Sequence, residues 1–258
     1  MTARDATTAP RVLTVEHEDG TGPGYLGDRI VAGGVRLELV RPYLGELLPA
    51  TLSGYQGLVV LGGSLGPFDD ERATWLPAVR RLMAEALADA VPLLGVCLGG
   101  ELLADVAGGR VGRAPAGPEL GIQTVRLTPD GRSDALFGDL PELAPAVEWH
   151  WEEIVELPPG STLLCGTDRF PHQAFRVGES AWGTQFHPEV LLASASEWAR
   201  HGADDLRRAG VDPERVIADV AEAEPRLRSV WGGLADRWAR YVIAQARRPG
   251  EAPSRSSQ

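Results

Sequence analysis

VPLLGVCLGGELLADVAGG, residues 91–109, joins an apolar run to a helical pattern through a single cysteine. The short run from Val91 to Val96 is typical of a parallel strand that is buried on both faces. From Leu98 to Ala107, leucine and valine recur at helical spacing. Cys97 is therefore expected in a sharp strand-to-helix turn, the outline of a nucleophile elbow.

Such a turn needs small neighbours, and Gly95, Gly99 and Gly100 supply them. The Cys97 thiol would lie at a helix N-terminus, where free backbone N–H groups and the helix dipole favour a thiolate and stabilise an oxyanion. A buried structural cysteine beside a tight turn is the alternative interpretation of this local pattern.

Composition limits the class of protein. The 258 residues suit one α/β domain with an appendage, or two small domains. A net charge of −11 argues against a surface for nucleic-acid phosphates, and the absence of lysine excludes both a P-loop lysine and a Schiff-base lysine. There is no apolar run near the ~20 residues that cross a bilayer, no secretory signal pattern and only two cysteines, so we expect a cytoplasmic protein without a membrane partner.

The first hundred residues alternate between strand and helix patterns. Strands are expected at 11–18, 35–42 and 57–63. A helix pattern at 71–90 leads into the strand that ends at Cys97. This alternation predicts a mostly parallel sheet with helices on both faces. The GGS segment (62–64) and Cys97 would then meet at the carboxyl edge of the sheet, where ligand sites form.

The rest of the chain changes character twice. Residues 121 to about 186 form short strand patterns separated by Gly, Pro and Asp turns. Helices are expected at 190–201, 213–222 and 226–247. The tryptophans of this last region could dock a partner or cover the edge of the protein's own sheet.

A cysteine nucleophile needs a base, and a base needs a group that orients it. GTQFHPEV, residues 183–190, offers both in His187 and Glu189. Pro188 keeps the chain between them extended, so that both side chains can face one pocket. His187 alone is more typical of a surface or packing histidine, but together with the elbow it predicts a Cys–His–Glu triad.

GVCLGGELLA (95–104) together with GTQFHPEV resembles the class I glutamine amidotransferase family, over roughly residues 11–192. Further pieces occur in the order found in stand-alone bacterial members of that family. They are VVLGGSLGPFDD (59–70), PELGIQTVRLTPDGRSDALF (118–137), VEWHWEEIVELPPGSTLLC (147–165) and HQAFRVG (172–178). Motifs that occur together in order are far more specific than any one of them.

The resemblance implies a reaction and its residues. Cys97 would attack the γ-carboxamide of glutamine, His187 would transfer the proton and Glu189 would orient His187. A γ-glutamyl thioester would form, ammonia would leave, and water would release glutamate. The backbone N–H groups of Gly63 and Leu98 would form the oxyanion hole. No cofactor and no metal ion is expected.

We therefore expect an α/β fold that is flavodoxin-like, with a mostly parallel sheet flanked by helices, a β-rich insertion and a C-terminal helical extension. The expected parts are a flexible N-terminus (1–10), the amidotransferase-like domain (11–192), the helical extension (193–247) and a disordered tail (248–258).

Three residues depart from the family pattern near the expected substrate site. Glu101 stands where the family usually has glutamine, and its carboxylate would oppose the α-carboxylate of free glutamine. Trp151 follows His150 where the family often has glycine, and Ser64 stands where proline is frequent. Glu101, His150 and Trp151 are the predicted substrate-binding residues, although Glu101 could equally be a good helix former that bonds nearby backbone.

Alternatives remain open. Because γ-glutamyl hydrolases of the same superfamily also carry glutamate at the position of Glu101, a γ-glutamyl peptidase is the first alternative, and a non-catalytic binding or regulatory module is the second. An amidotransferase would pass ammonia to a separate synthetase chain, whereas a hydrolase needs no partner. The glycines of LGGSLGP lack the spacing of a dinucleotide loop, and the spacing of His150, Cys165 and His172 fits no structural zinc pattern.

Overall fold

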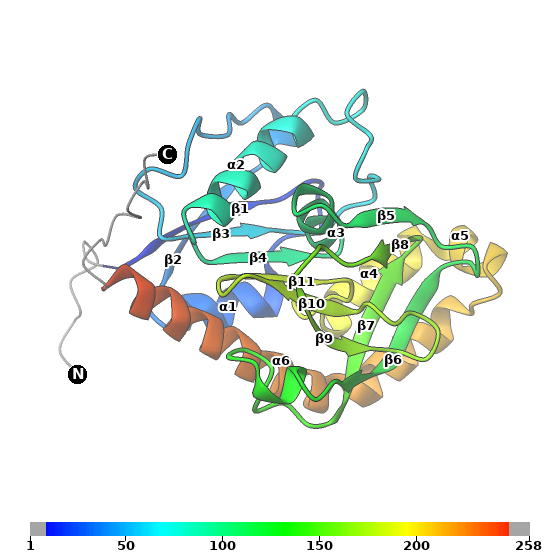
Figure 1. Ribbon diagram of the computed structural model, residues 1–258. Helices are drawn as coiled ribbons and strands as arrows, with labels where there is room; N and C mark the ends of the chain where they lie inside the picture. Colours follow the sequence, from blue (N-terminus) through cyan, green and yellow to red (C-terminus); the bar gives the residue numbers. More distant parts are fainter. Residues whose placement is uncertain (1–8, 248–258) are drawn as a thin grey trace.

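One sheet of nine strands forms the centre of the computed structural model, which describes residues 9–247 (Figure 1). In spatial order the strands are β2 (Arg36–Val40), β1 (Arg11–Val15), β3 (Gly57–Val60), β4 (Leu93–Val96), β11 (Ala181–Thr184), β10 (Ala174–Val177), β9 (Thr162–Gly166), β6 (Glu119–Leu127) and β7 (Leu143–His150). The half from β2 to β11 is parallel, and the half from β11 to β7 pairs antiparallel.

The helices are α1 (Gly24–Ala32), α2 (Leu76–Ala88), α3 (Leu98–Val106), α4 (Leu192–His201), α5 (Ala203–Arg208) and α6 (Pro213–Ala246), with short 3-10 turns η1 (Pro42–Leu44) and η2 (Gly131–Ser133). A separate antiparallel pair joins β5 (Arg110–Arg113) to β8 (Glu152–Glu156). The predicted α/β fold with flanking helices is confirmed, and the strands of the β-rich part other than β8 extend the same sheet.

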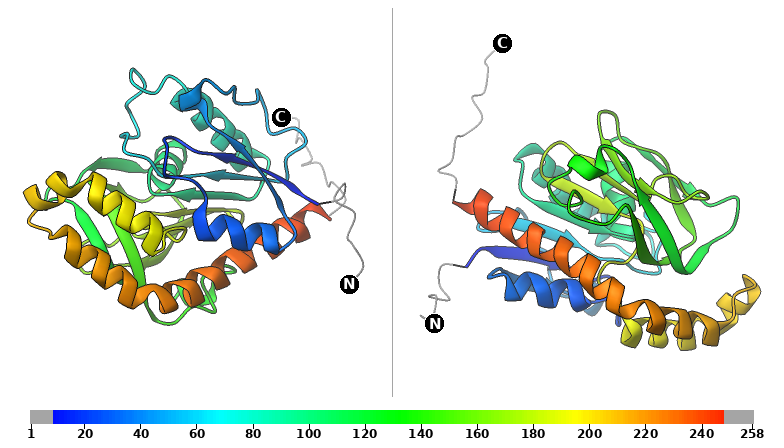
Figure 2. Two further views of the ribbon diagram at one scale, coloured as in Figure 1. Left: turned by 180° about the vertical axis from the view of Figure 1, so that it is seen from behind. Right: turned by 90° about the horizontal axis from the view of Figure 1, so that it is seen from below.

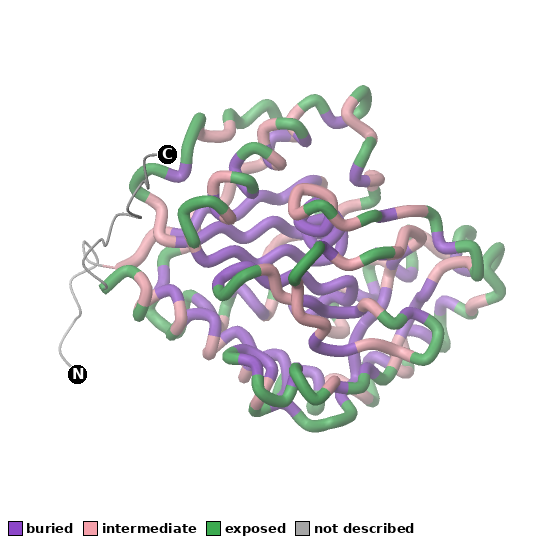
Figure 3. Tube along the Cα trace, viewed as in Figure 1, coloured by how far each residue is buried: buried purple, intermediate pink, exposed green. Residues whose placement is uncertain are grey.

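Helices cover both faces of the parallel half. α2 and α3 pack on one face, and α1 and α6 lie together on the other (Figure 2). Neighbouring residues of β1 show why apolar residues follow one another in this strand: Val12 belongs to one core and Leu13 to the other, and both are fully buried. Figure 3 shows the same pattern, with buried central strands and exposed connecting loops.

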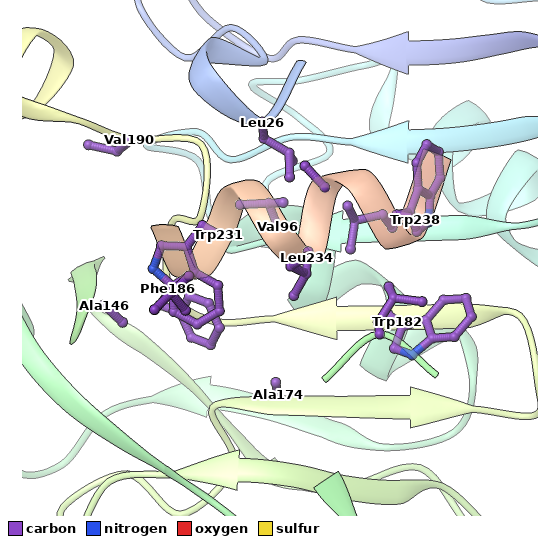
Figure 4. Close-up of a cluster of buried hydrophobic side chains, with 14 of the residues drawn as sticks. Leu26, Val96, Ala146, Ala174, Trp182, Phe186, Val190, Trp231, Leu234 and Trp238 are labelled. Atoms are coloured by element: carbon purple, nitrogen blue, oxygen red, sulfur yellow. The ribbon is translucent and has the colours of Figure 1, made fainter. Parts of the chain in front are cut away.

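The C-terminal extension is built into the core of the domain. Trp231 of α6 is buried, its ring lies 4.6 Å from that of Phe186, and its Nε1–H donates to the Pro145 carbonyl at 3.0 Å. Leu234 and Trp238 follow on the same side of α6 (Figure 4). Of the two predicted uses of the tryptophans in this region, covering the protein's own sheet is the one that Trp231 and Trp238 adopt.

The structure corrects the predicted helices of the extension. Segments 213–222 and 226–247 are one helix, α6, that continues through Pro225. Proline removes one helical hydrogen bond, but the fully buried Val220 and Leu227 on either side pack against the core and stabilise this turn. The short helix α5 has no counterpart among the predicted segments.

Two predictions concern the chain ends. The predicted tail, 248–258, lies outside the described residues, as does the predicted N-terminal segment 1–10 except for residues 9 and 10. Among residues 9–247, no helix combines the length and the apolar character needed to cross a membrane.

Candidate active site

Cys97 lies in the predicted strand-to-helix turn. β4 ends at Val96, α3 begins at Leu98, and Cys97 between them has φ of 50° and ψ of −109°. Such a conformation is strained for a residue with a side chain, and it persists where the surroundings over-determine it. Here the Cys97 N–H donates to the Thr184 carbonyl at 2.8 Å, and the Glu101 N–H donates to the Cys97 carbonyl at 2.8 Å.

The glycines around Cys97 let α3 pack directly on the backbone of the sheet. A Cβ on Gly99 would lie 2.0 Å from the Val60 carbonyl oxygen, and one on Gly100 would lie 2.5 Å from the Thr184 carbonyl oxygen. A Cβ on Gly95 would lie 2.4 Å from the carbonyl oxygen of Gly99. The predicted need for small residues is confirmed at all three positions.

His187 and Glu189 form a buried pair. His187 Nδ1 lies 2.7 Å from Glu189 Oε1, and each residue is only 3% exposed. The carboxylate accepts a hydrogen bond from Nδ1–H, so that the lone pair of a neutral His187 is on Nε2. His187 Nε2 has no hydrogen-bond partner among residues 9–247.

The side chains of His187 and Cys97 both lie next to Gly62. A Cβ built on Gly62 would lie 2.9 Å from His187 Cε1 and 3.4 Å from Cys97 Cβ. Both side chains therefore pack against the same short piece of backbone, in the loop that follows β3. The three residues predicted as a triad are brought together at the carboxyl edge of the parallel strands.

The acidity of the Cys97 thiol differs from the expectation. Burial raises the pKa of Cys97 well above its usual value, and the charges of Glu101 and Glu189 raise it further. The Leu98 N–H at the start of α3 acts in the opposite direction but is outweighed. The helix N-terminus was expected to favour a thiolate, whereas the surroundings favour a neutral thiol that must give its proton to a base when it reacts.

Glu101 is buried beside the cysteine, with an exposure of 3%. Gln185 Nε2 donates to its Oε1 at 2.8 Å. Burial raises the pKa of Glu101 from 4.5 to about 7, although the bond from Gln185 acts to lower it. Near neutral pH this side chain can therefore be a carboxylate or a neutral acid.

A cavity of about 710 Å³ opens over these groups. Most of the predicted site residues line it, namely Gly63, Cys97, Glu101, His150, Trp151 and His187. Its wall also includes acidic residues from several loops, among them Glu18, Asp19 and Asp69. The volume falls within the ~300–1,000 Å³ typical of small-molecule sites.

Sequence reasoning missed Trp198, which α4 brings to the cavity. Its ring packs edge-on against His187 with 4.9 Å between ring centroids, and it also contacts Trp149 at 5.8 Å. Trp198 Nε1–H donates to the Gly20 carbonyl at 3.1 Å. The sequence shows several tryptophans in the C-terminal extension, but it does not indicate which of them faces the site.

His150 lines the cavity, yet both of its ring nitrogens face protein groups. Nδ1 lies 2.6 Å from the Glu152 carbonyl oxygen, and Nε2 lies 3.5 Å and 3.4 Å from Glu119 and Glu148. Burial lowers the pKa of His150, but the two facing glutamates outweigh burial and raise the pKa to about 10. Its predicted role in binding substrate stays a prediction.

His150, Cys165 and His172 do not converge on one point in the described part of the chain. His172 Nδ1 lies against the Ile154 carbonyl at 2.7 Å. In the described part of the chain, the group whose ligand atoms could share an ion is Glu119, Glu148 and His150. Both glutamates lie within the motifs PELG and VEWH, but the sequence did not show that they face one histidine.

Known proteins resemble this chain in sequence and structure. The family model for glutamine amidotransferase class-I matches residues 26–201. The chain is 34% identical to a GMP synthase (glutamine-hydrolyzing) of Porphyromonas gingivalis over 58% of its own length, but it spans only 28% of that protein. It is 29% identical to γ-glutamyl peptidase 5 of Arabidopsis thaliana, over 54% of this chain and 55% of the peptidase.

Solved structures agree with the sequence comparisons. A glutamine amidotransferase from Thermotoga maritima superimposes with a TM-score of 0.80 at 28% identity, over 89% of this chain and 98% of the other. The match of the family model over most of the chain, with this likeness in fold, shows that the protein belongs to the class I glutamine amidotransferase family of enzymes.

Proposed function

We propose that the protein is a cysteine hydrolase that cleaves the γ-carboxamide of glutamine through a γ-glutamyl thioester. The observation that carries the proposal is the placement of His187, whose Nδ1 is bonded to Glu189 and whose ring packs with Cys97 against Gly62. This is the arrangement of a nucleophile, a base and a group that orients the base.

In the first half of the reaction, His187 Nε2 accepts the thiol proton while Cys97 Sγ bonds to the γ-carbonyl carbon. Such a transfer suits a thiol that is neutral at rest. The oxyanion is stabilised by the backbone N–H groups of Leu98 and Gly63. The C–N bond then breaks, His187 gives its proton to the departing nitrogen, and ammonia leaves.

In the second half, His187 removes a proton from water as the water oxygen bonds to the thioester carbon. The C–S bond breaks, the Cys97 sulfur takes the proton back from His187, and glutamate is released. Glu189 keeps Nδ1 protonated throughout, which fixes Nε2 as the nitrogen that exchanges protons.

A second candidate is hydrolysis of γ-glutamyl conjugates. Glu101 supports it, because γ-glutamyl hydrolases of the same superfamily also carry glutamate at this position, and here the side chain is buried beside Cys97. The cavity also has room beyond a γ-glutamyl group, with Trp151 on its wall. Under this candidate the enzyme works alone, whereas an amidotransferase delivers ammonia to a separate synthetase chain.

The experiment is to measure glutamate release from free glutamine and, in parallel, from γ-glutamyl peptides and γ-glutamyl amines, with Cys97→Ala as the control. Release from glutamine supports the amidotransferase reaction and calls for a search for a synthetase. Release only from conjugates supports the peptidase. Equal release by Cys97→Ala contradicts the mechanism, and no release from any substrate favours the binding or regulatory module.

A further inference from the structure

Three buried side chains with metal-ligand chemistry meet where β6 pairs with β7. Glu119 lies directly opposite His150 in the antiparallel register, and Glu148 is two residues from His150, so all three share one face of the sheet. One ligand atom from each lies within 4.8 Å of the other two. We refer to Glu119, Glu148 and His150 as the β6–β7 cluster.

Two members of the β6–β7 cluster have buried polar atoms without the hydrogen bonds that such atoms usually make. The side chains of Glu119, Glu148 and His150 are 4%, 0% and 1% exposed. Within residues 9–247, the carboxylate of Glu148 and Nε2 of His150 have no hydrogen-bond partner outside the cluster, and His150 Nε2 lies only 3.4 Å from Glu148 and 3.5 Å from Glu119. Two facing carboxylates removed from water are costly unless a cation pairs with them.

The surroundings of the β6–β7 cluster orient its atoms toward one another. The Glu152 carbonyl oxygen accepts a hydrogen bond from His150 Nδ1–H, so a neutral His150 directs the lone pair of Nε2 at the two glutamates. Glu119 is fixed by Gln173 Nε2 at 2.5 Å and by the Thr167 hydroxyl at 3.2 Å. Metal-binding histidines and carboxylates are held by outer contacts of this kind.

We propose that Glu119, Glu148 and His150 bind one divalent first-row metal ion. One imidazole nitrogen with carboxylate oxygens and no thiolate suits Zn²⁺ or Mn²⁺. Two carboxylates, a neutral imidazole and a divalent ion sum to zero charge, which a buried site favours. His150 borders the cavity, which gives the ion a route of entry.

The ion joins the ends of β6 and β7 next to Trp151, and so it stabilises one wall of the cavity. The cysteine chemistry proposed above does not involve it. The competing occupant of the same space is a proton on His150 Nε2, which would make the β6–β7 cluster an ion pair of one imidazolium with two glutamates. Measuring whether the purified protein contains a metal ion distinguishes the bound metal from the proton.

The full chain, produced without a metal-affinity tag, is stripped with a chelator, dialysed against Zn²⁺ or Mn²⁺ and analysed by elemental mass spectrometry and calorimetric titration. We expect one ion per chain and a concentration-dependent rise in Tm. Glu148→Gln and Glu119→Gln should each weaken binding about 100-fold or more, since loss of an outer contact alone costs about 10–100-fold.

Two matched controls are Glu101→Gln, a buried glutamate of the same cavity outside the β6–β7 cluster, and Cys97→Ala, which removes the thiol that lines that cavity. Both should keep the ion. No bound ion and no rise in Tm for the wild-type protein would overturn the proposal without any variant, in favour of the proton. Loss of the ion in Cys97→Ala would overturn it too, because the ion would then belong to the thiol.

Discussion

Replacing Glu101 with glutamine should stabilise the protein at alkaline pH much more than at acidic pH. The side chain is buried, and burial raises its pKa from 4.5 to about 7. An acid whose folded-state pKa is raised binds its proton more tightly when folded, so the free energy of unfolding falls as pH rises through this interval and then stays level. Glutamine carries no charge to bury and can still accept the bond from Gln185.

The magnitude follows from the two pKa values. The cost of ionising Glu101 in the folded state is about 3 kcal/mol at pH 8 and under about 1 kcal/mol at pH 5. Glu101→Gln should therefore gain about 2 kcal/mol more stability at pH 8 than at pH 5.

Urea unfolding of both proteins at the two pH values measures the difference directly. The control is Glu142→Gln, because Glu142 forms an ion pair with Arg126 at the surface and is 60% exposed, so its replacement relieves no burial of charge. A gain from Glu101→Gln that is the same at pH 5 and pH 8, or larger at pH 5, would refute the reasoning, because the ionised carboxylate would then carry no cost.

Three further changes test the packing around the site. Trp198→Ala frees the ring of His187 and should lower kcat about 10-fold with a smaller effect on KM, whereas Trp198→Phe should retain most activity; an unchanged kcat in steady-state kinetics for Trp198→Ala would contradict this role. Gly99→Ala forces a Cβ against a backbone oxygen and should cost about 3 kcal/mol or more in urea unfolding, so a variant of normal stability would argue against the tight packing of α3. Trp231→Ala should cost about 3–5 kcal/mol in one cooperative transition, and a separate early transition of the extension would show that α6 is not part of the main core.

The site could be predicted where its geometry is local. The strand, turn and helix around Cys97 lie within 19 consecutive residues, and His187 is only two residues from Glu189. Spacing along the sequence is therefore enough to predict the turn at Cys97 and the pairing of His187 with Glu189. The alternation of strand and helix patterns likewise predicts the parallel half of the sheet, because each helix returns the chain to the same edge.

What could not be predicted depends on pairing between distant residues. Glu119 faces His150 only because β6 and β7 pair in one register, and a shift of one residue would turn the side chains to the other face. Trp198 reaches His187 through the packing of α4, which no local pattern specifies. The raised pKa of Cys97 follows from burial and from glutamates assembled by the fold, whereas sequence reasoning saw only the helix N-terminus.

The most direct test of Cys97 as the nucleophile is to trap the covalent intermediate. The protein is mixed with the substrate that it turns over fastest, quenched in acid within milliseconds and digested, and the peptide that contains Cys97 is analysed by mass spectrometry. We predict one added γ-glutamyl group on Cys97, which disappears as substrate is exhausted and is absent when His187→Ala is mixed in the same way. Turnover of that substrate with no adduct on Cys97 at any quench time, or an adduct on Cys165 instead, would contradict the assignment.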